Sequence, residues 1–151
     1  MNRKWTVLLA SMGVFALVCA FSSVTSVASP GADDSPLHKL MEKVNKTHNS
    51  LRNAVKTPVA YKKAGTKQIL EDAEALLKQA KESRDFTEPA KEQKKPQKEW
   101  TDATDVMIKT TGEFIEVIKA DKGPAEAKKA LVPVTKSCSD CHAIFRVDED
   151  F

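Results

Sequence analysis

Glycine and aromatic residues are scarce in this chain of 151 residues, which has 5 glycines and an aromatic content of 6%. An all-β sandwich needs many turns and β-forming side chains, so this composition disfavours it and favours a helical domain. The length suits one globular domain and excludes a multidomain enzyme. Charged residues make up 30% of the chain, which is too polar for a polytopic membrane protein.

A large excess of either charge is also lacking. The formal net charge is +3, and the 24 basic and 21 acidic residues are spread along the chain. Nucleic-acid binding needs basic residues gathered into a patch or stripe. We therefore expect no nucleic-acid partner.

Charged residues are absent over residues 5–32, a run with an apolar centre that follows a short basic start. This is the layout of a secretory signal peptide. Small residues at Ser26 and Ala28 predict cleavage after Ala28, which gives a signal peptide over residues 1–28 and a mature domain over residues 29–151. An uncleaved anchor helix is the alternative. We expect export to the periplasm or an equivalent compartment, with no membrane contact after cleavage.

Four stretches of the mature domain repeat apolar residues at steps of three and four, which is the spacing of an amphipathic helix. The first begins at Ser35 and Pro36, a capping residue followed by proline, and Pro58 ends it. Four such helices predict an all-α, antiparallel four-helix bundle. The other three helices are expected over about residues 66–83, about residues 97–120, and from Pro124 to near the C-terminus.

Two segments interrupt this pattern. Pro133 falls within the fourth helix and predicts either a kink or a late start. Residues 84–96 contain two prolines and many charged residues, and they are longer than a usual connection between helices. We expect this segment to be a solvated crossover.

The chemistry of the sequence lies in a C-x-x-C-H motif formed by Cys138, Cys141 and His142. This pattern is typical of haem c attachment, in which the two thiols reach the two vinyl groups and the histidine is an axial iron ligand. On a helix, positions i, i+3 and i+4 share one face, so all three side chains can meet one porphyrin. A disulfide or a zinc site is the alternative, but zinc needs four ligands, and the other histidines lie far upstream. We expect one covalent haem c near the C-terminus.

The exported helical bundle and the terminal sequence Cys-Ser-Asp-Cys-His-Ala-Ile-Phe-Arg over residues 138–146 resemble the class II cytochromes c, the cytochrome c′ family. The resemblance implies that Cys138 and Cys141 form the thioether bonds and that His142 is the proximal ligand. It also implies that Arg146 lies near the proximal haem face. Arg146 follows His142 by four residues, on the same face, where it can orient a ligand or pair with a propionate. A surface arginine at a helix end is the alternative.

The distal side of the iron is expected to face the first helix, because the end of the fourth helix lies beside the start of the first in an antiparallel bundle. His38 and Met41 are neighbours there, and either can reach the iron. His48 lies about 15 Å further along the helix, which is too far. An exposed His38 with an open or solvent-ligated iron is the alternative. In the family, this side carries an apolar side chain in many members and a methionine in others.

The function depends on that distal side. A six-coordinate iron favours an electron carrier, and we expect a periplasmic monohaem cytochrome that transfers electrons with redox partner proteins. An open or displaceable site favours binding or sensing of small gases such as NO or CO. Catalysis needs a distal acid or base, and nothing beyond His38 supplies one, so we do not expect an enzyme. The resemblance further implies a homodimer, or a heterodimer with a related subunit.

Overall fold

The structure is a computed structural model that describes residues 35–146. The expected signal peptide over residues 1–28 lies outside this range. Within it, no helix is long and apolar enough to cross a membrane. The described chain is all-helical, with the elements α1 (Pro36–Val55), α2 (Pro58–Ala64), α3 (Thr66–Arg84), α4 (Glu88–Glu92), α5 (Gln97–Lys119) and α6 (Gly123–Phe145).

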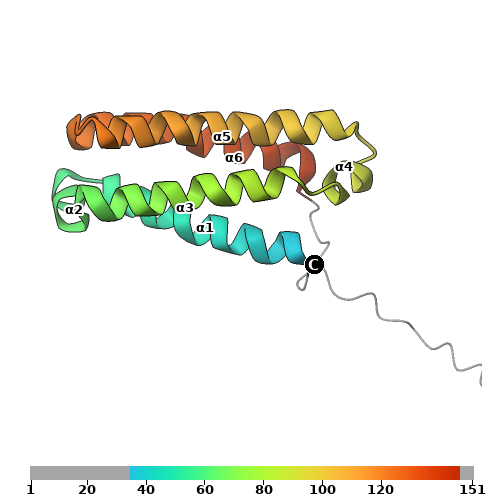
Figure 1. Cartoon of the computed structure of the whole chain (residues 1–151), viewed down its shortest axis with the longest axis horizontal. Helices are drawn as coiled ribbons and strands as arrows, with labels where there is room; N and C mark the ends of the chain where they lie inside the picture. Colours follow the sequence, from blue (N-terminus) through green and yellow to red (C-terminus); the bar gives the residue numbers. More distant parts are fainter. Residues whose placement is uncertain (1–34, 147–151) are drawn as a thin grey trace, which may run out of the picture.

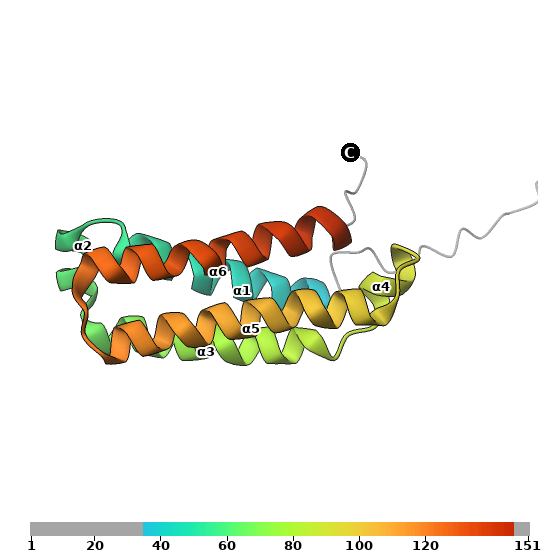
Figure 2. The ribbon, with the colours of Figure 1, turned by 90° about the horizontal axis from the view of Figure 1, so that it is seen from above.

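The four long helices, α1, α3, α5 and α6, form a bundle (Figures 1 and 2). Neighbours along the chain pack against each other, and α6 closes the arrangement by packing against α1. Each fully buried apolar side chain stabilises the fold by about 1.5–3 kcal/mol relative to an exposed one. The helical bundle predicted from the apolar stripes is therefore confirmed. Its fully buried apolar members include Leu51, Ile69, Leu76, Phe114, Ile118 and Val134.

The helices α1 and α2 begin in the same way. At α1, the Ser35 hydroxyl accepts a hydrogen bond of 3.0 Å from the backbone N–H three residues later, and Pro36 occupies the first helical position. At α2, Thr57 and Pro58 repeat this arrangement with a hydrogen bond of 3.1 Å. Pro58 therefore follows the first helix as predicted, and it also starts a short helix that was not predicted.

The crossover over residues 84–96 differs from the solvated connection that we predicted. Its middle forms α4, in which Pro89 and Ala90 are buried. Ala90 belongs to a cluster with Trp100 of α5 and Phe145 of α6. Most of the crossover is exposed as predicted, but the burial of its middle was not predicted, because its apolar contacts come from distant elements and the segment has no apolar periodicity.

The helix α6 runs continuously through Pro133, which excludes a late start. Two residues later, the Thr135 hydroxyl donates a hydrogen bond of 3.2 Å to the Leu131 carbonyl. The same hydroxyl lies 2.9 Å from Nε2 of His48, a buried residue of α1. Because the Thr135 proton is used toward Leu131, the hydroxyl accepts from His48, whose Nε2 carries the proton. This hydrogen bond joins α6 to the middle of α1.

Candidate functional site

Cys138 and Cys141 lie one turn apart on α6 as free, half-buried thiols. Cys138 packs against the main core, and Cys141 packs against a second apolar cluster. Burial raises the pKa of the Cys138 thiol, and burial followed by the proximity of Cys138 raises the pKa of Cys141 to about 11. The two thiols are therefore neutral near pH 7, and they lie on one side of the helix where a single group can reach both.

The second cluster, here called the end cluster, lies where the start of α1, the crossover, the start of α5 and the end of α6 meet (Figures 1 and 2). The rings of Trp100 and Phe145 pack edge to face in it, with their centroids 5.2 Å apart. The end cluster therefore brings the end of α6 beside the start of α1, as an antiparallel bundle requires. Its members are Leu37, Phe86, Ala90, Trp100, Ala103, Cys141 and Phe145.

His142 follows Cys141 directly and is exposed at the surface of α6. Desolvation by the atoms around its ring, and then the charge of Arg146, lower the pKa of His142 below its ordinary value. The ring is therefore neutral near pH 7, and neutral imidazole is the form that binds iron. His142 is available as an axial ligand without first losing a proton.

Arg146 caps the C-terminal end of α6. It is exposed, and its backbone N–H donates a hydrogen bond of 3.1 Å to the carbonyl of His142. After desolvation, the charge of Arg146 is the second cause that lowers the pKa of His142. The arginine therefore lies beside the expected proximal ligand.

On the expected distal side, the residue of the first turn of α1 that enters the end cluster is Leu37. His38 is 41% exposed, and its Nε2 lies 3.9 Å from the Glu42 carboxylate. Met41 is half-buried and packs against the main core, which Cys138 also contacts. Of the two predicted distal ligands, neither belongs to the cluster that contains Cys141.

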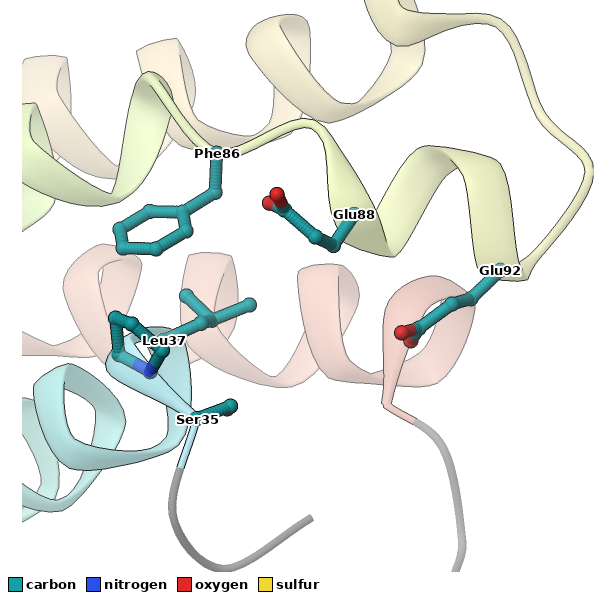
Figure 3. A pocket seen from close by; sticks show the side chains of 6 residues that line it. Ser35, Leu37, Phe86, Glu88 and Glu92 are labelled. Atoms are coloured by element: carbon teal, nitrogen blue, oxygen red, sulfur yellow. The ribbon is translucent and has the colours of Figure 1, made fainter. Parts of the chain in front are cut away.

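A pocket of about 160 Å³ opens beside Leu37 at this end of the bundle. Figure 3 shows Leu37 and Phe86 on facing sides of it, with Glu88 and Glu92 projecting from α4. Pockets that hold organic ligands of drug size commonly measure about 300–1,000 Å³. The pocket is therefore too small for a porphyrin, and its lining contains none of Cys138, Cys141 and His142.

The donor set fits a haem better than a bare metal ion. Across residues 35–146, no three His, Cys, Asp or Glu side chains converge to hold a metal. A structural zinc ion needs four such ligands, so the zinc alternative has no ligand set in this part of the chain. Iron in a porphyrin needs only axial ligands from the protein, and His142 beside two thiols meets that need.

A helical bundle whose last helix carries two thiols and an imidazole in C-x-x-C-H order has the construction of a c-type cytochrome. The family model of cytochrome c′ matches residues 37–146, which span all six helices and the motif. The chain belongs to the cytochrome c′ family. The comparisons with curated proteins and with solved structures found no match.

The sequence analysis did not identify the side chains that surround Cys141. Leu37 and Trp100 stand in the apolar stripes of their helices; Leu37 shares the expected distal turn with His38 and Met41, but only those two were chosen as candidates. Phe86 and Ala90 lie in the crossover, where no periodicity marks them. The position of Leu37, three residues before the buried Leu40, is the one signal that indicated an inward-facing side chain in the first turn.

Proposed function

We propose that this cytochrome c′ holds one haem c through Cys138 and Cys141, with His142 as the proximal iron ligand. The distal side of the iron then faces Leu37, and the protein binds a small neutral gas such as NO or CO there. The packing of Leu37 against the cluster of Cys141 supports this assignment. A leucine side chain has no lone pair to donate to iron. When bound, the haem supplies an iron coordination position for a diatomic molecule.

The side chains around Cys141 favour a neutral ligand. Leu37, Phe86 and Trp100 are apolar, and moving a charged or strongly hydrated ligand among them costs free energy of desolvation. A diatomic gas has little hydration to lose. On the proximal side, Arg146 lies where its charge acts on His142, and this position supports a role in orienting a ligand or pairing with a propionate.

Electron transfer is the second candidate function, and the position of Met41 favours it. Met41 is half-buried against the same core that Cys138 contacts. Methionine is an unbranched side chain that adapts to its surroundings, so Met41 would be a residue of α1 able to offer a thioether to the iron. A six-coordinate iron of this kind transfers electrons to a redox partner protein with little change of shape.

The remaining features of the proposal concern the setting of the protein. Attachment of haem to a C-x-x-C-H motif, together with the apolar leader over residues 1–28, supports export to the periplasm or an equivalent compartment. The apolar character of the end cluster supports a binding or carrier role rather than an enzyme. Family membership supports a homodimer, or a heterodimer with a related subunit.

Visible absorption spectra of the exported protein test the proposal. The ferric and ferrous forms are recorded before and after addition of CO, for the wild type and for the variants His38→Ala and Met41→Ala. We expect high-spin bands that CO shifts, and both variants to match the wild type. A third variant, Leu37→Ala, widens the distal side, so CO should bind to it faster.

Sharp low-spin bands that CO leaves unmoved would contradict gas binding. If Met41→Ala or His38→Ala then restored the response to CO, that residue would be the sixth ligand, and electron transfer would be the better conclusion. The protein would also be made in cells that have a haem-attachment system. If it then showed no spectrum of covalently bound haem, both functions would be refuted.

A further inference from the structure

The charges are not evenly spread, although the balanced net charge led us to expect an even spread: basic residues are concentrated in the part of the chain that surrounds α2. Residues 43–70 contain seven Lys or Arg and no Asp or Glu. The net charge of the whole chain is only +3, so this excess is local. All seven side chains are exposed, and they are Lys43, Lys46, Arg52, Lys56, Lys62, Lys63 and Lys67.

The outer face of α2 combines this charge with an apolar side chain. Val59, Lys62 and Lys63 are spaced i, i+3 and i+4, so they share one face of the helix, while Tyr61 is buried on another. Val59 is 78% exposed, the highest value among the exposed large apolar residues in the described part of the chain. Val59 therefore lies among lysines on a face of α2 that is open to solvent.

Two lysines of α6 extend this surface. The helix α2 packs against both α1 and α6, and Figure 1 shows it at the same end of the bundle as the turn between α5 and α6. Lys128 and Lys129 lie in the first turns of α6 and are exposed. We call the resulting surface the basic end, and it consists of Lys56, Val59, Lys62, Lys63, Lys128 and Lys129.

The lysines of the basic end form no ion pair with any residue in the range 35–146. On α5, by contrast, the basic side chains sit beside carboxylates, as in the pair of Lys98 and Asp102 at 2.6 Å. The acidic residues nearest in sequence to these lysines are Glu71, Asp121 and Glu126, which are fewer than the five lysines, and Glu71 lies 3.9 Å from Lys67. The basic end therefore keeps a net positive charge.

We infer that the basic end binds the surface of an anionic lipid bilayer. A cluster of four to eight Lys or Arg attracts anionic headgroups, and an exposed apolar residue among them reaches into the interface. This departs from the expectation, drawn from the sequence, that the mature protein does not contact a membrane. The inference is independent of which ligand the iron takes.

The position of the basic end favours a lipid surface over an acidic redox protein. From Leu37, beside Cys141, to Lys56 the axis of α1 rises by about 28 Å. Electron transfer slows steeply with distance, so a redox partner docked at the basic end would be poorly placed to exchange electrons with the haem. A bilayer bound there holds the bundle by the opposite end and leaves the haem end facing the solvent.

Vesicle co-sedimentation of the exported holoprotein tests this inference. The vesicles contain either phosphatidylcholine alone or phosphatidylcholine with about one third phosphatidylglycerol, at low and at high salt. The variant K56Q/K62Q/K63Q removes three charges from the basic end. Its control, K78Q/K81Q/K91Q, removes three exposed charges from α3 and α4. Val59→Asp and Val132→Asp form a second matched pair, since Val132 is 63% exposed on α6.

We expect binding to the anionic vesicles alone, weakened by salt because exposed charges are screened. The loss of three lysines from the basic end should weaken the apparent affinity roughly a hundredfold, and their control variant should bind as the wild type does. Val59→Asp should weaken binding more than Val132→Asp does.

If the protein bound neutral and anionic vesicles equally, the inference would be overturned. Such binding would not depend on charge, and an apolar leader retained on the protein would explain it. If the two triple variants weakened binding to anionic vesicles equally, the inference would also be overturned, because binding would then depend on the total charge and not on the lysines of the basic end. Binding to a soluble acidic protein or polyanion without binding to vesicles would replace the bilayer by an acidic macromolecule.

Discussion

The buried His48 makes the stability of the bundle depend on pH. Burial, and then the charge of Arg52, lower the pKa of His48 below the value of an exposed histidine. In the unfolded chain, this histidine takes up a proton below about pH 6.5, whereas the folded protein does so only at lower pH. Between these two pKa values the unfolded state binds more protons, so the free energy of unfolding falls as the pH falls.

The magnitude follows from the proton count. One histidine that is protonated only in the unfolded state gives a slope of at most about 1.4 kcal/mol per pH unit. The full contribution of His48 is present above pH 6.5, and it is lost progressively as the pH falls through the folded pKa. His48→Gln keeps an N–H that can reach Thr135 but cannot titrate, so this variant should lack the slope that His48 contributes.

Urea unfolding of the wild type and of His48→Gln, at intervals between pH 5 and pH 8, measures this contribution. The difference between the two proteins cancels the titration of every other group. A second variant, Thr135→Val, leaves the His48 N–H buried without an acceptor and should cost about 1–3 kcal/mol at pH 8. If the difference between wild type and His48→Gln stayed constant from pH 8 to pH 5, the reasoning from burial would be refuted.

Three further predictions concern the end cluster and the cap of α1, each measured by urea unfolding. Phe145→Ala should lower the free energy of unfolding by about 3–5 kcal/mol, because Phe145 is only 5% exposed, while Val106→Ala at a 51% exposed site should change it by less than about 0.5 kcal/mol. Trp100→Phe removes the hydrogen bond of 3.0 Å that the indole Nε1–H donates to the Ser83 carbonyl, so it should lower the free energy of unfolding by about 1–3 kcal/mol. An unchanged free energy of unfolding would show that water replaces the indole N–H as the donor. Ser35→Ala removes the cap of α1 and should cost about 1 kcal/mol, whereas Ser35→Gly should cost only a few tenths; equal costs would contradict a capping role.

The sequence predicted the long helices well, because each buries one face and therefore carries an apolar stripe. The short helix α2 carries the same starting signal as α1, a hydroxyl residue followed by proline, so Thr57 and Pro58 could have revealed it. The packing of α4 could not be predicted. The partners of Ala90 are Trp100 and Phe145, and nothing within the crossover indicates which distant helices will cover it.

The first turn of α1 shows a second feature that the sequence alone could not predict. The motif indicated Cys138, Cys141 and His142, because their spacing has a chemical meaning that does not depend on how helices pack. Leu37 and His38 are adjacent, and one residue along a helix turns a side chain by about 100°. Which of the two faces the end cluster is set by how α1 rotates against its neighbours, and the apolar stripe alone does not fix that angle near a helix end.

The half-buried thiols of Cys138 and Cys141 have a consequence for how the proposed haem would be attached. In the folded chain, the end cluster covers the Cys141 side of the last helix with the side chains of three other elements. Under the proposed function, a porphyrin must reach both sulfur atoms to form its bonds, and we predict that it does so before this end of the bundle closes. Folding and attachment then compete for the same chain. A substitution that slows closure of the end cluster would thus raise the yield of haem-loaded protein even while it lowers the stability of the fold.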